Sequence, residues 1–118
     1  MEELKIGTAD GRSLTVYDAG NPDGRPILFH HGTPSSGVPF ERHVELAREQ
    51  GVRLLSYDRA GYGDSTRMPG RAVTDVAQDV EVIAEKLGLE QFATWGRSGG
   101  GPHALATAAG LADRVVAV

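Results

Sequence analysis

One glycine-rich turn carries the residues with the clearest chemical potential. Gly96-Arg97-Ser98-Gly99-Gly100 has the pattern G-x-S-x-G and lies between an apolar segment, Phe92 to Trp95, and an Ala-rich segment. A serine on a sharp strand-to-helix turn holds its hydroxyl above the sheet, where the oxygen can attack a carbonyl carbon. Side chains two positions to either side would collide, which explains Gly96 and Gly100. The same geometry directs the N–H of Gly99 at the position where an oxyanion forms.

The alternative interpretation of this turn is structural: its glycines would serve only to pack a helix tightly against a sheet. The chain has 16 glycines among 118 residues, so the pattern also arises by chance. The apolar segment before the turn and the Ala-rich segment after it supply the context that the motif requires, and they favour the catalytic interpretation.

A second loop offers another backbone donor for the same oxyanion. His31-Gly32-Thr33-Pro34 follows directly after the apolar run Ile27 to His30, which is typical of a strand covered on both faces. We expect the N–H groups of Thr33 and Gly99 to form an oxyanion hole, with Gly32, Gly96 and Gly100 supporting the loop and the turn. The alternative is an ordinary strand-to-helix turn in which His30 and His31 are packed or hydrogen-bonded.

A third glycine cluster, Asp58-Arg59-Ala60-Gly61-Tyr62-Gly63-Asp64-Ser65, follows an apolar run that ends at Tyr57. Its glycines permit positive φ angles and close approach of the backbone. We expect Asp58 and Arg59 to pair and brace this loop; the alternative is that they line a pocket. Neither Asp58 nor Asp64 is predicted to be a catalytic acid.

The elements that position these loops follow from hydrophobic periodicity. The pattern predicts strands at 3–8, 13–17, 27–30, 52–57, 92–95 and 114–118, and helices at 39–50, 74–87 and 104–111. The first two helices are expected to begin at Pro39 and at a capping Thr74 and to end before Gly51 and Gly88, and the first helix is expected to bury a stripe of Phe40, Val44 and Ala47. Asp10-Gly11 predicts a hairpin turn between the first two strands. Strands separated by helices are parallel with right-handed crossovers. The expected fold is therefore α/β: a three-layer, mostly parallel sheet with an N-terminal antiparallel hairpin, ending at about the sixth strand.

Composition excludes several function classes. The net charge is −4, with 12 basic and 16 acidic residues scattered along the chain, so no nucleic-acid partner is expected. No apolar run reaches the roughly 18 residues of a membrane helix. The absence of cysteine removes disulfides and thiolate sites, and with the acidic N-terminus it predicts a cytoplasmic location. No phosphate-binding glycine motif is complete and the four histidines lack paired spacing, so neither a cofactor nor a metal is expected.

Three motifs in this order resemble the α/β-hydrolase fold family, specifically its esterase-like and peptidase-like members. The segment 27–34 is similar to the family's oxyanion-loop strand, the segment 57–65 to its D-x-x-G-x-G-x-S loop, and the segment 95–101 to its nucleophile elbow. The resemblance covers essentially the whole chain. It implies that Ser98 is a nucleophile, that Thr33 and Gly99 supply the oxyanion hole, and that the substrate is a small molecule with an acyl bond.

The chain also departs from this family's pattern. In the family the catalytic acid and histidine come later than Val118, and so does the cap over the pocket. Arg97 stands where many relatives carry histidine. We therefore expect residues 1–118 to form the N-terminal part of a hydrolase domain, inactive alone and competent only with a C-terminal half. That half, or another chain, is expected to cover the apolar edge Val115–Val118.

No histidine of this chain is expected to act as the base. His43 is predicted to face solvent, His103 to point away from the nucleophile, and His30 and His31 to brace their loop. The competing hypothesis is a non-catalytic ligand-binding protein of the same fold. It would hold if either the acidic residue or the histidine of the triad were missing from the complete domain.

Overall fold

The computed structural model describes residues 1–118, and their apolar segments form one six-stranded sheet in the order β1-β2-β4-β3-β5-β6. The strands are β1 (Glu2–Gly7), β2 (Ser13–Gly20), β3 (Arg25–His30), β4 (Val52–Tyr57), β5 (Phe92–Gly96) and β6 (Val115–Ala117). The helices are α1 (Glu41–Glu49), α2 (Val76–Leu87) and α3 (Gly100–Gly110), with a short 3₁₀ turn, η1 (Val73–Asp75), before α2.

The direction of the strands follows the predicted topology. β1 and β2 form an antiparallel hairpin, and Gly11 in its turn has a φ of +83°, which glycine adopts without strain. β2 is also antiparallel to β4, whereas the three pairs β4–β3, β3–β5 and β5–β6 are parallel. The expected mixed sheet with an N-terminal antiparallel hairpin is confirmed.

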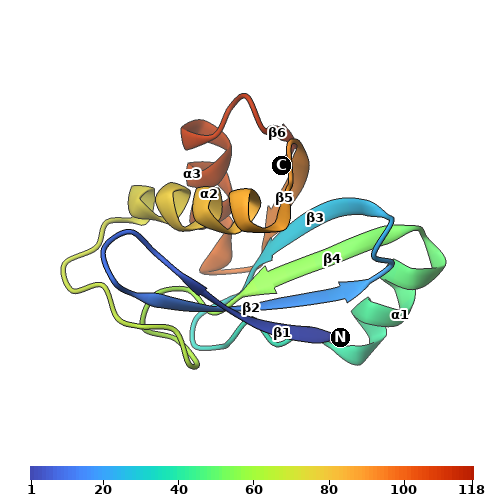
Figure 1. Ribbon diagram of the computed structural model, residues 1–118, viewed down its shortest axis with the longest axis horizontal. Coiled ribbons are helices and arrows are strands. Elements are labelled where there is room, and N and C mark those ends of the chain that lie inside the picture. The colour runs from blue at the N-terminus through green and yellow to red at the C-terminus, as the bar shows by residue number, and fades with distance from the viewer.

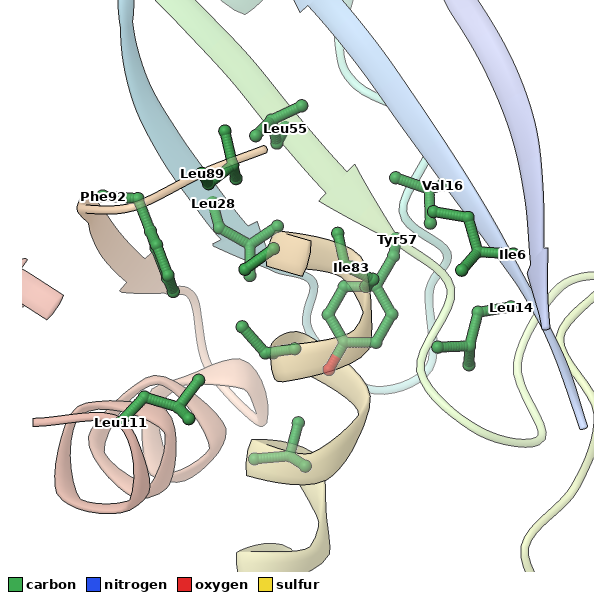
Figure 2. Close-up of a cluster of buried hydrophobic side chains, with 13 residues drawn as sticks. Ile6, Leu14, Val16, Leu28, Leu55, Tyr57, Ile83, Leu89, Phe92 and Leu111 are labelled. Carbon is green, nitrogen blue, oxygen red and sulfur yellow. The ribbon is translucent and has the colours of Figure 1, made fainter. Parts of the chain in front are cut away.

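Helices cover both faces of the sheet, which gives three layers. α2 and α3 lie on one side and α1 on the other (Figure 1). The larger core lies between the sheet and the α2–α3 layer, where Leu14, Leu55, Ile83 and Phe92 are essentially inaccessible to solvent (Figure 2). The smaller core, beneath α1, contains Ala19, Val44, Ala47 and Leu54. Burial of these side chains is the main stabilising contribution to the fold.

Glycine ends two helices as predicted, but the helix starts differ from expectation. Gly51 and Gly88 follow α1 and α2 with φ angles of +67° and +70°. The prediction that α1 begins at Pro39 is wrong, because Phe40 keeps an extended backbone and only its carbonyl accepts from the N–H of Val44, at 3.1 Å. Phe40 is therefore exposed rather than part of the buried stripe.

The predicted cap of the second helix is also wrong. Thr74 lies inside η1, and the carboxylate of Asp75 accepts the N–H of Ala72 at 2.8 Å instead. The third helix begins at Gly100, four residues earlier than expected. Pro102 is tolerated in its first turn because the N–H groups there have no partner within the helix.

The parallel strands bring three loops to one edge of the sheet. β3, β4 and β5 end at His30, Tyr57 and Gly96, and His30 pairs with Gly96 in the register. The segments that follow these strands therefore leave the sheet side by side, which is where α/β folds place their ligand sites. No helix of the structure combines the length and the apolar character needed to cross a membrane.

Candidate active site

Ser98 lies at the tip of the turn between β5 and α3 and is exposed to solvent. Its φ is +53°, and it is the one non-glycine residue with a positive φ in the structure. Such a conformation costs about 1–3 kcal/mol for a residue with a Cβ and persists only where the surroundings impose it. Hydrogen bonds on both sides hold the turn: the N–H of Arg97 donates to His30 O at 3.2 Å, and that of Gly100 to Arg97 O at 2.8 Å.

The two glycines that flank the turn are required by close backbone contacts. A Cβ at Gly96 would overlap the carbonyl of Gly100, and a Cβ at Gly100 would overlap the carbonyl of His30. Gly32 makes a looser contact, since its Cβ would lie 3.5 Å from the Cβ of Ser98. The steric reason that the sequence suggested for Gly96 and Gly100 is therefore present in the structure.

The two predicted oxyanion donors lie next to each other. A Cβ at Gly99 would lie 2.6 Å from Thr33 Oγ1 and 3.4 Å from the backbone nitrogen of Thr33. Neither the N–H of Thr33 nor that of Gly99 donates a hydrogen bond to any other group of the protein. Most backbone N–H groups in folded proteins are paired, so two adjacent free donors beside an exposed serine are suited to receive an anionic oxygen.

A pocket of about 520 Å³ opens over these residues. Ser98, Arg97 and Thr33 line it together with serine hydroxyls of the loop that follows β3. Its apolar wall is formed by Phe29, Val38, Pro39 and Phe40. The exposed hydroxyl of Ser98 thus faces a space large enough for a small organic molecule.

Asp58 and Arg59 brace the site, but they do not pair with each other, and this part of the expectation is wrong. The buried carboxylate of Asp58 accepts hydrogen bonds from the N–H of Gly37 at 2.7 Å and from the N–H of Asp64 and the hydroxyl of Tyr17, each at 3.1 Å. Burial together with this carboxylate raises the pKa of Tyr17 to about 12. Asp58 therefore connects β2, the loop after β3 and the loop after β4.

The guanidinium of Arg59 instead holds the loop that carries Thr33. Its side chain is almost fully buried, and it donates to the carbonyl of His31 and, at 3.2 Å, to Oγ1 of Thr33. Tyr62 supports the same group: its hydroxyl donates to Thr33 Oγ1 at 3.2 Å, and its ring lies 5.3 Å from the guanidinium carbon. Burial lowers the pKa of Arg59, which has no carboxylate partner.

The two histidines at the end of β3 are packed away from Ser98. His30 is fully buried, and its Nε2 lies 3.2 Å from Thr107 Oγ1; burial lowers its pKa to about 3, so its ring is neutral. Nδ1 of His31 lies 2.7 Å from the carbonyl of Gly32, and its Nε2 accepts the N–H of Arg59 at 3.2 Å. The expectation that His31 braces the loop agrees with these contacts, whereas the side chain of His30, expected to brace the same loop, contacts Thr107 of α3 instead.

The other two histidines are also engaged elsewhere. Nδ1 of His103 lies 2.7 Å from the carbonyl of Gly99, and its Nε2 lies 3.1 Å from the guanidinium of Arg71. The prediction that His43 faces solvent is wrong: its ring is half-buried, 5.4 Å from the ring of Phe40 and 6.1 Å from that of Trp95. Ser98 forms no hydrogen bond with any of the four histidines, so residues 1–118 contain no base in contact with it.

Comparison with known proteins decides the family. Residues 25–118 match the sequence pattern of the family described as alpha/beta hydrolase fold. The chain belongs to this family. Its members with similar sequences carry different activities in their names, and the Ser98 turn, the Thr33 loop and the pocket described above lie within the matched residues.

Three relatives illustrate the range of this hydrolase-fold family. The chain is 33% identical over 97 residues to a non-heme chloroperoxidase of Streptomyces lividans and to a bifunctional esterase/perhydrolase of Acinetobacter calcoaceticus, covering 81% of this chain and 35% of each relative. It is 30% identical over 116 residues to a proline iminopeptidase of Arabidopsis thaliana, covering 95% and 30%. The chain thus spans about a third of the length of these curated relatives.

Solved structures agree with this assignment. The chain superposes on a thermophilic esterase from Thermogutta terrifontis with a TM-score of 0.82 and 30% identity, covering 98% of this chain and 43% of the esterase. An epoxide hydrolase from Vigna radiata gives a TM-score of 0.79 at 18% identity, covering 97% and 36%, which supports the fold alone.

Two features of the site were not identified from the sequence. Arg59 was expected to pair with its neighbour in the chain, whereas it holds Thr33, 26 residues away. The free state of the two amides also has no sequence signature, because it depends on which carbonyl groups the folded chain leaves within reach. The sequence Tyr57-Asp58-Arg59 at the end of a predicted strand indicates that Arg59 lies in a loop, but it does not indicate which group the side chain binds.

Proposed function

We propose that this chain is the nucleophile-bearing part of a serine hydrolase that cleaves an ester, amide or similar acyl bond. One observation carries the proposal: exposed Ser98, in a left-handed backbone conformation, lies beside the unpaired N–H groups of Thr33 and Gly99. Membership of the alpha/beta hydrolase fold family supports it, as does the likeness to proteins named as an esterase and a peptidase.

In the proposed reaction, Oγ of Ser98 attacks the carbonyl carbon of a substrate held in the pocket. The hydroxyl proton passes to a base while the carbonyl oxygen becomes an oxyanion, which accepts hydrogen bonds from Thr33 and Gly99. The bond to the leaving group breaks as that group takes up the proton. Water then attacks the acyl-enzyme, gives its proton to the same base, and releases the acid and free Ser98.

The base and the acid that orients it are proposed to lie outside residues 1–118. His30, His31 and His103 are held by other partners, and no carboxylate lines the pocket beside Ser98. A segment following Val118, or another chain, would supply these groups and lie against β6, where Val116 and Val118 are about 60% exposed. The cytoplasmic location stays a prediction.

The experiment uses the protein expressed with all residues that follow Val118 in its reading frame. A fluorophosphonate probe reacts covalently with an activated serine, so the wild-type protein should be labelled. Ser98→Ala should abolish labelling, while Ser35→Ala, which removes an exposed hydroxyl of the same pocket, should leave it in place.

Labelling that persists in Ser98→Ala would remove this serine from the mechanism. A wild-type protein that binds esters but is never labelled and never releases product would favour the ligand-binding hypothesis.

A further inference from the structure

Among the residues that line the pocket beside Ser98, Arg97 is the single one with a permanent charge, and none is an aspartate or glutamate. The one other ionisable group of the wall is His31, whose ring nitrogens both lie at hydrogen-bond distance from backbone groups and whose pKa is lowered by burial. The pocket is therefore electropositive in a protein whose net charge is −4.

Arg97 has no anionic partner in the structure, unlike several other arginines. Arg12, Arg53 and Arg114 each lie within 4 Å of a carboxylate oxygen, whereas Arg97 forms no ion pair and is exposed. Its guanidinium forms no side-chain hydrogen bond to the protein, so its donors remain available. The planar fork of a guanidinium matches the two oxygens of a carboxylate.

The position of Arg97 ties this charge to the nucleophile. The residue directly precedes Ser98, and its backbone is fixed on both sides, by the N–H bond to His30 O and by the bond from Gly100 N to its own carbonyl. Its side chain therefore starts from a fixed point beside the serine. Phe29, Val38 and Phe40 supply an apolar wall, which suits a short hydrocarbon segment.

We propose that Arg97 makes this site selective for acyl substrates that carry a carboxylate a few carbons from the scissile carbonyl group. This inference rests on the proposed hydrolase function and specifies its substrate class. The cation binds the carboxylate, the apolar wall receives the intervening carbons, and the carbonyl carbon lies over Ser98.

The test compares two esters of the same shape and different charge, 4-nitrophenyl hydrogen glutarate and 4-nitrophenyl methyl glutarate, in the protein expressed with all residues that follow Val118. The wild-type protein should have the higher kcat/KM for the anionic ester. Arg97→Gln should lower the ratio of the two kcat/KM values by roughly 10- to 100-fold, mostly through KM, because it removes a charged hydrogen bond. Arg97→Lys should give an intermediate ratio.

A matched control separates local charge from net charge. Arg48→Gln removes one positive charge from the exposed face of α1, outside the pocket, and should leave the ratio unchanged. A second pair, 4-carboxyphenyl butyrate and 4-(methoxycarbonyl)phenyl butyrate, places the charge on the leaving group. A fall in the ratio for either pair in Arg97→Gln supports the proposal and identifies the side of the scissile bond that Arg97 contacts.

Fluorophosphonate labelling distinguishes failure of this inference from failure of the proposed function. If the wild-type protein and Arg97→Gln are both labelled at Ser98 but their ratios are equal for both ester pairs, Arg97 does not select for a carboxylate and the inference is overturned. If the wild-type protein is not labelled, the hydrolase function itself is overturned, and with it this substrate class.

Discussion

At the scale of single residues, the site depends on Arg59, a buried cation that does not line the pocket. Arg59 is almost completely inaccessible, and its guanidinium donates to the loop that carries Thr33. Placing an arginine inside a protein without a carboxylate is costly, because the charge loses its hydration. The hydrogen bonds to His31 and Thr33 and the ring of Tyr62 offset part of that cost. We therefore interpret Arg59 as a positioning residue.

Replacing Arg59 by lysine keeps the positive charge but removes the planar guanidinium group. Thr33 Oγ1 should therefore lose one of the two hydrogen bonds that it accepts, and keep the one from Tyr62. We expect Arg59→Lys to slow fluorophosphonate labelling of Ser98 by about 10-fold, because a displaced oxyanion donor costs transition-state stabilisation. The measurement is the second-order labelling rate together with the midpoint of thermal unfolding.

Arg67→Lys is the control, since Arg67 lies exposed on the same segment after β4 and forms no ion pair. An Arg59→Lys protein that is labelled as fast as Arg67→Lys would show that Thr33 does not need this support.

At the scale of elements, the site is produced by the contact between the ends of β3 and β5 and the start of α3. The backbone of Gly100 lies so close to the carbonyl of His30 that a methyl group has no room there. This contact explains why the Ser98 turn is held in its left-handed conformation rather than relaxing.

Gly100→Ala should therefore lower the free energy of unfolding by at least about 2 kcal/mol, because either the carbonyl of His30 or the helix must move. Gly101→Ala is the matched control one residue later, where an added Cβ meets nothing within 4 Å. Alanine there should leave stability unchanged or raise it by up to about 1 kcal/mol. Urea unfolding measures both; equal stabilities for the two variants would contradict the close contact.

Local patterns predicted the elements well because each depends on neighbours in the chain. The apolar stripe of α2 with Gly88 at its end, the Asp10-Gly11 turn and the G-x-S-x-G turn are all specified within about a dozen residues. Side-chain partners were not predictable in this way. Arg12 and Asp79 form a buried two-bond ion pair although 67 positions separate them, and Asp58 finds Gly37 and Tyr17 rather than its neighbour Arg59.

At the scale of the whole molecule, the fold buries three histidine side chains, those of His30, His31 and His103. His30 lies between the sheet and α3 with a pKa of about 3, and burial also lowers the pKa values of His31 and His103. The unfolded chain binds a proton at the ring of His30 near the ordinary pKa of 6.5, whereas the folded chain binds it only near pH 3. The contribution of neutral His30 to stability is therefore complete above about pH 6.5 and is lost as the pH falls from 6.5 towards 3.

We expect His30 to make the free energy of unfolding decrease below pH 6.5 by about 1.4 kcal/mol per pH unit, and the lowered pKa values of His31 and His103 to add to this decrease. His30→Leu should reduce the slope of this decrease by the contribution of one bound proton, because leucine occupies the same buried position and does not titrate. Urea unfolding between pH 7 and pH 4.5 measures the slope; a slope identical to that of the wild-type protein would show that His30 is not held neutral by the fold.

The central claim is that the hydroxyl of Ser98 becomes covalently modified when the site acts on an electrophile. The most direct measurement is peptide mass mapping after reaction of the protein, expressed with the residues that follow Val118, with a fluorophosphonate. Trypsin cleaves after Arg97 and Arg114, which isolates Ser98 as the single serine of the peptide 98–114. We predict one phosphonyl group on Ser98 in that peptide. A phosphonyl group on any other residue, or an unmodified peptide 98–114 after exhaustive reaction, would contradict the account.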